Sequence, residues 1–241
     1  MPTQSNTVKK LTWLELVVLF GIPTALNAIA CKVSIPFFQN YSNLPIEISY
    51  FLSVGILVLM PMFFAGYFLS KKETPSGNFR QVLARMRIKK LTRSDWAWTV
   101  LGFLGLVLSS YLIAKVLMPK FGMDATPFFF QNMPLDSQHM YIVWIWPLFF
   151  FFNIFGEEFY WRGYIQTRQE KLNGRVTWLV HGTLWAFWHS PMGWDLIVAS
   201  APIFFILPAI VMIRKNTSIA IIIHTVFGAF GFLAISFGGV H

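Results

Sequence analysis

The amino-acid sequence predicts an all-α fold, a polytopic transmembrane helix bundle with about seven spans. Of the 241 residues, 56% are hydrophobic, only 12% are charged and 26 are Phe. Long uncharged runs recur along the chain, and the basic residues fall in short clusters between them. A soluble domain of this size could not keep so much apolar side chain off its surface, so the lipid bilayer is the expected solvent.

The clearest predicted spans, 48–69 and 96–114, are uncharged runs long enough to cross a hydrocarbon core of about 30 Å as helices. The run that begins at residue 140 contains Pro147 and Gly156 but no cluster of turn residues before Arg162, so we expect one long helix there. Turns are indicated by Asn173-Gly174, by Pro191 and Gly193, and by the basic stretch after Ile213. The predicted spans are 11–30, 48–69, 96–114, 140–162, 176–189, 196–213 and 218–237.

The first span raises a separate question, because it follows Lys9 and Lys10 and ends in a small-residue stretch before Cys31. That pattern has some likeness to a cleavage site for a signal or lipoprotein peptidase. The further spans and the length of this one favour an uncleaved first helix. We therefore treat residues 1–241 as a single transmembrane domain.

The distribution of Lys and Arg predicts how the bundle is oriented. Positive charge concentrates in cytoplasmic segments of membrane proteins, which places the N-terminus inside and the C-terminus outside after seven crossings. Such a chain is expected in the plasma (inner) membrane. The segments predicted to be inside hold 15 of the 19 Lys and Arg residues, namely Lys9, Lys10, Lys71, Lys72, Arg80, Arg85, Arg87, Lys89, Lys90, Arg93, Arg168, Lys171, Arg175, Arg214 and Lys215.

The distribution of the net charge of +9 and the single cysteine argue against a nucleic-acid-binding protein and a disulfide-bonded or thiolate-metal protein. The basic clusters carry no nucleic-acid recognition motif, so we expect them to face anionic lipid headgroups and we expect no nucleic-acid partner. The longest loop, residues 70–95, is rich in Arg and Lys and is expected to form an amphipathic segment at the inner leaflet. Cys31 alone can form neither an internal disulfide nor a thiolate metal cluster.

Ionisable side chains inside spans point to the candidate site, because each costs several kcal/mol unless it is paired or hydrated. Glu158 and Arg162 are four residues apart and share a helix face, with the acid first, which is the favourable order. Glu157 has no such partner by spacing. A carboxylate in that position is suited to take a proton from water and return it to a leaving group.

The next helix brings candidate histidines. His189 and Glu157 are equally distant from the predicted turn at 173, so they are expected at the same depth, with Trp185 beside the imidazole. His224 lies in the last span, and its convergence on the same pocket is plausible from spacing without being required by it.

Each of these residues also has a purely structural interpretation. The Glu158–Arg162 pair could simply lock two spans together. His181 has no partner by spacing and is interpreted as a packing residue. Gly228 and Gly231 are interpreted as a close helix-packing face. For Glu157, His189 and His224 taken together a packing role is harder to argue, because all three are unneutralised.

These residues resemble the motifs of the CPBP family, which contains the CAAX prenyl endoproteases and the bacteriocin-processing enzymes and is also called Abi. The likeness rests on Glu157-Glu158-x-x-x-Arg162, on Trp185-x-x-x-His189 and on His224 in an apolar helix. It covers a core of residues 140–237, and the paired glutamates are its most specific part. The first three spans are similar only in character.

The resemblance implies an intramembrane endopeptidase that cleaves a lipidated, CAAX-like or membrane-inserted peptide. Glu157 and His189 would activate a water, His224 would polarise the scissile carbonyl or hold the oxyanion, and Glu158 and Arg162 would shape the site. The catalytic set is thus Glu157, Glu158, Arg162, His189 and His224.

Two positions depart from the family pattern. Trp185 stands where Phe is usual, and Gly228 stands where the last motif usually has Asn. The second change removes an amide donor, and losing one oxyanion donor typically costs on the order of 100-fold in rate.

The cofactor and the function class stay open. Glu157, His189 and His224 could bind one divalent metal such as zinc, as in a metalloprotease, or the glutamate could act on water without a metal. The alternatives to a peptidase are a non-catalytic immunity or scaffold protein of the same fold and a small proton-coupled transporter. The transporter is disfavoured because we find no inverted repeat. The expected partners are a peptide or lipidated protein substrate and membrane lipids.

Overall fold

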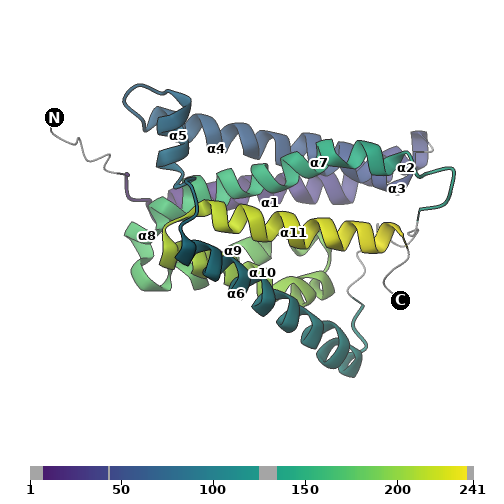
Figure 1. The fold of residues 1–241 in the computed structure, drawn as a ribbon. Coiled ribbons are helices and arrows are strands. Elements are labelled where there is room, and N and C mark those ends of the chain that lie inside the picture. The colour runs from purple at the N-terminus through teal and green to yellow at the C-terminus, as the bar shows by residue number, and fades with distance from the viewer. Residues whose placement is uncertain (1–7, 43, 125–134, 238–241) are drawn as a thin grey trace.

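The computed structural model describes residues 8–42, 44–124 and 135–237, and every regular element in these ranges is helical (Figure 1). The prediction of an all-α transmembrane bundle is confirmed. The elements are α1 (Trp13–Ile29), η1 (Ala30–Ser34), α2 (Ile35–Ser42), α3 (Ile46–Tyr50), η2 (Phe51–Leu59), α4 (Met60–Lys72), α5 (Phe79–Arg85), α6 (Arg93–Leu112), η3 (Ile113–Leu117), η4 (Met118–Phe121), α7 (Ile142–Glu157), η6 (Glu158–Gln166), α8 (Thr167–Asn173), η7 (Gly174–Val176), α9 (Thr177–Trp188), η8 (Ser190–Met192), α10 (Trp194–Arg214) and α11 (Thr217–Ser236).

The helices combine into about seven crossings. Within the described ranges, five helical stretches are long and apolar enough to span a membrane, and Thr217–Leu233 is a shorter apolar helix. One of the five stretches, Ile142–Met192, reverses direction at Gly174, whose φ of +57° suits a glycine turn. It therefore contains two crossings, α7 and α9. The chain is an integral membrane protein.

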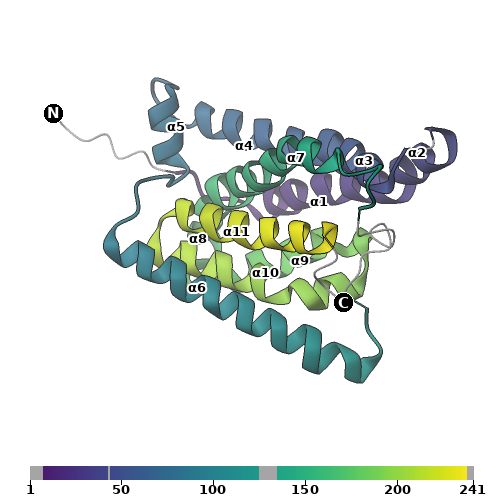
Figure 2. The same ribbon diagram turned by 45° about the vertical axis from the view of Figure 1, so that its right-hand side comes forward.

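The surface of the bundle has the character expected of lipid-facing helices. Along α6 the large apolar side chains of Leu101, Leu104 and Leu108 are each more than half exposed. In Figure 2 this helix runs along the outside of the bundle, where it packs mainly against α10 and α11. In water such a face would be a large apolar patch, whereas in a bilayer it contacts acyl chains.

One continuous helix carries the paired glutamates, as predicted from the unbroken apolar run. It consists of α7, η6 and α8, and its middle part, Glu158–Gln166, is π-helical. The hydrophobic pattern did not indicate that widened stretch. Helical segments with i→i+5 hydrogen bonds are rare and occur frequently at functional sites. Every residue of η6 is buried in the bundle.

Two glycines let this helix approach its neighbour α4 and the preceding η2 very closely. A Cβ atom on Gly156 would lie 2.5 Å from the carbonyl oxygen of Leu59, and one on Gly66 would lie 2.8 Å from the backbone of Phe159 and Tyr160. Neither backbone can move aside like a side chain, so these positions require glycine. The contacts fix the depth and rotation of the helix just before and after Glu157.

The segment predicted to lie on the inner leaflet is instead packed partly against the bundle. In α5 and the turn after it, Val82 and Met86 are fully buried next to Phe159. Arg85 is also buried and donates to Thr167 and Glu73. The loop is therefore attached to the helix that carries the candidate site.

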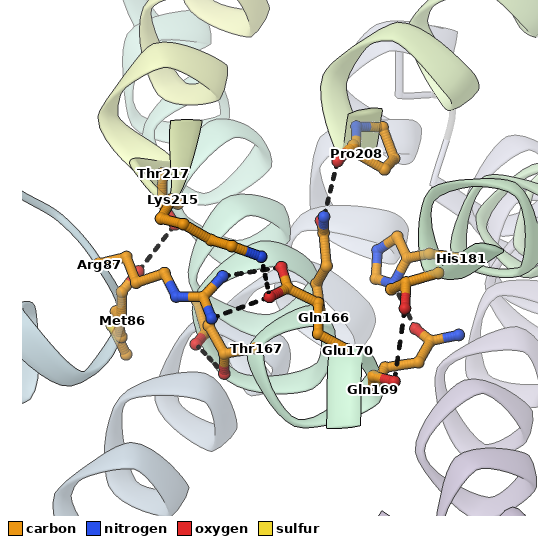
Figure 3. A network of polar contacts seen from close by, with 12 residues as sticks. Met86, Arg87, Gln166, Thr167, Gln169, Glu170, His181, Pro208, Lys215 and Thr217 are labelled. Carbon is orange, nitrogen blue, oxygen red and sulfur yellow. Dashed lines mark hydrogen bonds and ion pairs between the residues drawn. The ribbon is translucent and has the colours of Figure 1, made fainter. Parts of the chain in front are cut away.

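A polar network joins α8 to the two basic turns that contain Arg87 and Lys215 (Figure 3). Glu170 on α8 accepts two hydrogen bonds from Arg87, at 2.7 and 3.0 Å, and also contacts Lys215. Both cations have left-handed backbone conformations, with φ of 58° and 51°. Thr217 donates to the carbonyl of Met86 at 2.7 Å. The basic turns are thus bound to one carboxylate on the central helix.

Candidate functional site

Glu157 ends α7 and is almost completely buried. One carboxylate oxygen accepts a hydrogen bond from the Nδ2 of Asn153 at 3.0 Å, and the other accepts one from the indole Nε1 of Trp185 at 2.7 Å. The expectation that Glu157 lacks a helix partner is therefore wrong, because Asn153 lies one turn earlier on the same face. Both donors are neutral, so they hold the carboxylate without cancelling its charge.

Glu158 and Arg162 form the predicted ion pair, with 3.3 Å between Oε1 and Nη1, and both side chains are fully buried. The guanidinium also lies over the indole ring of Trp185, 3.5 Å from the ring centroid. Within the described part of the chain, no nitrogen of this guanidinium makes a hydrogen bond. The charge of Arg162 is therefore balanced by one carboxylate and one aromatic face.

His189 follows the last residue of α9, and its ring lies beside those of Trp188 and Phe204. Its Nδ1 is 2.9 Å from the carbonyl oxygen of Trp185. A carbonyl can only accept, so Nδ1 carries the hydrogen and, in a neutral ring, Nε2 is the free acceptor. The ring is thus oriented by the residue that also contacts Glu157.

His224 on α11 is buried, and the spacing in the sequence leaves its partner open. Its Nδ1 is 2.9 Å from Oε1 of Glu158, the same oxygen that pairs with Arg162. Its ring lies 6.0 Å from that of Trp185, edge to face. The structure therefore brings His224 to the candidate site through Glu158 and not through Glu157.

The three residues considered as metal ligands do not form a ligand set in this arrangement. Among the described residues, no group of three His, Cys, Asp or Glu side chains is placed to hold a metal ion. Both oxygens of Glu157 accept hydrogen bonds from nitrogen donors. We therefore derive no step of the chemistry through a metal.

Of the three remaining positions, His181 and Gly228 have packing roles. His181 is fully buried, and its Nδ1 lies 2.8 Å from Oε1 of Gln169 (Figure 3). Its ring also packs edge to face against the ring of Phe20. The interpretation of Gly228 as a packing residue agrees with its surroundings, because a Cβ there would lie 3.2 Å from Phe150. Gly231 has nothing within 4 Å of such a Cβ, so its interpretation as part of a packing face is wrong.

Sequence reasoning missed the contributions of Asn153 and of the Trp185 indole. Asn153 is an amide in a run of phenylalanines, one helical turn before Glu157, and that position could have identified it. Trp185 was expected only as a bulky ring, whereas its N–H contacts one candidate residue and its carbonyl another.

Three comparisons with known proteins gave one match. No curated protein and no solved structure was found to match the chain. Residues 139–230, which contain all five candidate catalytic residues, match the family model described as Type II CAAX prenyl endopeptidase Rce1-like. This match confirms the resemblance to the CPBP family over that segment and indicates, at the level of the family, a membrane protease of the CAAX type.

Proposed function

We propose that the chain is an intramembrane endopeptidase whose general base is Glu157, within a catalytic core of residues 140–237. The observation that carries this proposal is a buried carboxylate held by two neutral N–H donors, Asn153 and Trp185, in the segment that matches CAAX prenyl endopeptidases. Such a carboxylate stays oriented and keeps free lone pairs, since each oxygen accepts only one of these two bonds.

In the proposed reaction, Glu157 takes a proton from a water while the water oxygen bonds to the scissile carbonyl carbon. The carbon–nitrogen bond then breaks, and the proton held by Glu157 passes to the leaving amine. His189 assists by accepting a hydrogen bond from the same water at Nε2, because its Nδ1 is occupied by the Trp185 carbonyl. The products are a carboxylate and an amine.

His224 is proposed to stabilise the oxyanion that forms on the substrate. Its Nδ1 lies 2.9 Å from the Glu158 carboxylate, so Nε2 is the ring nitrogen that is left for the substrate. In the proposed role, Nε2–H donates to the developing negative charge. Glu158 and Arg162 support this ring and do not themselves exchange protons with the substrate.

The proposed substrate is a lipidated, CAAX-like peptide cut near its C-terminus, or a membrane-inserted peptide of the bacteriocin type. The family match supports a prenylated protein or peptide as the substrate class. The buried position of the base supports a bond presented within the bilayer, where water activity is low and electrostatic effects are strong.

A second candidate function is a non-catalytic immunity or scaffold protein of the same fold. The observation that favours it is Gly228, which provides no amide at the place where the family motif has Asn. In this alternative Glu157 and its donors would only join α7 to α9.

Cleavage by the purified protein distinguishes these candidates. We expect protein in detergent or lipid nanodiscs to release the C-terminal fragment of a fluorogenic farnesylated CAAX peptide, and to release less from the same peptide without the lipid. Because no step needs a metal ligand set, activity should persist after chelation and dialysis. Activity that is lost on chelation and restored by Zn²⁺ would contradict the proposed chemistry, and a lack of cleavage of any lipidated peptide would favour the scaffold.

The orientation proposed from the charges has its own test. A reporter fused after Lys90 should be cytoplasmic and one fused after His241 should be external, because most basic residues then face the cytoplasm. The measurement is the paired activity of alkaline phosphatase and green fluorescent protein fusions in a bacterial plasma membrane. Both fusions on one side would contradict an odd number of crossings.

Restoring the family's amide gives a gain-of-function prediction. An Asn at 228 would lie one turn after His224, but its Cβ would press on Phe150 at 3.2 Å. We therefore expect Gly228→Asn in a Phe150→Leu background to cleave up to about 100-fold faster than Phe150→Leu alone, which is the usual contribution of one oxyanion donor. Initial rates of the two variants provide the comparison, and equal rates would show that an amide at this place does not reach the oxyanion.

A further inference from the structure

Trp185 lies at the centre of the candidate site and is almost completely buried. Its ring or its backbone contacts four of the five candidate catalytic residues. These are Glu157, Arg162, His189 and His224.

The side chain of Trp185 fixes Glu157. The distance of 2.7 Å from Nε1 to the carboxylate oxygen is short for a nitrogen donor, as expected for a hydrogen bond to a charged acceptor. A Phe ring in the same place, which is the residue usual in the resembling family, has no donor. This contact is therefore a feature of this chain, and it cannot be replaced by the ring alone.

The backbone of the same residue fixes His189. The Trp185 carbonyl accepts from Nδ1 at 2.9 Å, which selects the ring orientation and leaves Nε2 toward the reaction. A substitution of the side chain does not remove this carbonyl. The two contacts of Trp185 can therefore be separated by experiment.

The ring itself is held on its face and at its edge. The Arg162 guanidinium lies 3.5 Å from the ring centroid, and the Phe204 ring packs against it at 4.9 Å. A cation over an aromatic face is attracted to it, and the attraction is strongest for indole. Since Glu158 holds Arg162, the second glutamate is connected to the first through Arg162 and Trp185.

We propose that Trp185 is a positioning residue that orients the Glu157 carboxylate through its indole N–H. Because Arg162 lies against the indole ring and is paired with Glu158, the position of this pair also determines where the carboxylate lies. This inference rests on the proposed function of Glu157 as the base. Trp185 contacts no reacting atom itself. It limits the rotation of the carboxylate, so that the free lone pairs point to one water position.

Trp185→Phe tests the inference, because it keeps an aromatic ring and the carbonyl but removes the donor, together with part of the ring volume. We expect kcat to fall about 10-fold with KM nearly unchanged, as for the loss of one hydrogen bond to a charged group. The matched control is Trp161→Phe, a fully buried Trp on η6 whose Nε1 has no hydrogen-bond partner among the described residues. The control loses the same ring volume and should keep kcat within about 2-fold. Equal losses in the two variants would overturn the inference.

A spectroscopic measurement tests the contact independently of cleavage. In protein labelled with ¹⁵N at its 10 Trp indoles, the resonance absent from Trp185→Phe is that of Trp185. We expect this N–H resonance to move upfield in Glu157→Gln, because the acceptor loses its charge, and to stay in place in Glu170→Gln. An unmoved resonance would overturn the inference. If the wild type cleaves no peptide but the resonance moves, the proposed function fails and only the contact remains.

Discussion

Glu157→Gln should lower the rate of peptide cleavage at least about 100-fold, because the substitution keeps the side-chain volume and removes the proton acceptor. The effect should appear in kcat, since substrate binding does not depend on this proton. Initial rates over a range of peptide concentrations measure it directly.

The fold should tolerate Glu157→Gln, because both hydrogen bonds of the side chain can be kept. A Gln oxygen can still accept from the Trp185 indole, and its NH₂ can donate to the Asn153 amide once that amide turns its oxygen inward. No donor is then left without an acceptor. We therefore expect the thermal unfolding temperature in detergent to change by only a few degrees, as for small stability changes in general.

Two variants make this test specific. Glu170→Gln removes a carboxylate from the same continuous helix but outside the site, where it contacts Arg87 and Lys215, and should keep kcat. Glu157→Asp keeps the charge but withdraws it by one methylene, so it should recover part of the rate. A Glu157→Gln variant that cleaves at the wild-type rate would refute the role of Glu157 as the base.

The sequence was sufficient to predict the spans, because span length, turn residues and charge clusters are local properties of the chain. The turns at Asn173-Gly174 and after Arg214 lie where the structure has residues with left-handed backbone, Gly174 and Lys215. The Glu158–Arg162 pair could be predicted for the same reason, since residues four apart on a helix are neighbours.

Contacts between helices could not be predicted in the same way. Counting residues from a turn gives the depth of a side chain in the membrane but not the direction in which it faces. His224 was therefore grouped with Glu157, whereas the rotation and position of α11 bring it to Glu158. The π-helical stretch could not be predicted either, because the pattern of apolar residues in a short run does not distinguish i→i+4 from i→i+5 hydrogen bonding.

Of the contacts of Trp185, one could be predicted from the sequence and another could not. That its ring lies beside His189 follows from their spacing on one helix, and the two ring centroids are 5.8 Å apart. That its indole reaches Glu157 depends on the placement of α9 against α7, and the usual Phe at this position would not have suggested a donor. The most informative residue of the site was thus one of the two that departed from the family pattern.

The pairing of Glu158 with Arg162 leads to a large expected effect on stability. Removing one partner of a buried ion pair costs about 3–5 kcal/mol, because the remaining charge is left in a low-dielectric interior. Arg162 would keep the face of the Trp185 ring and a longer-range attraction to Glu157, neither of which replaces the 3.3 Å contact with Glu158. Glu158→Gln should therefore lower expression and the thermal unfolding temperature, as measured by size-exclusion chromatography of heated samples in detergent.

A second substitution separates the charge from the shape of the site. In the double variant Glu158→Gln/Arg162→Met, both charges of the pair are removed together, and replacing a buried pair by neutral groups is often close to neutral in stability. We expect the double variant to recover most of the unfolding temperature lost in Glu158→Gln. It should not recover cleavage, because His224 has then lost its carboxylate partner and Trp185 its cation.

An exposed ion pair gives the matched control for this prediction. Lys215→Met breaks the contact with Glu170, but Lys215 is half exposed and Glu170 keeps its two hydrogen bonds from Arg87. Pairs of this kind contribute about 0–1 kcal/mol, so the unfolding temperature should hardly change. If Glu158→Gln were no less stable than Lys215→Met, Arg162 could not depend on Glu158 for its charge balance. If the double variant were less stable than Glu158→Gln, the pair would stabilise the bundle through its shape rather than through its charge.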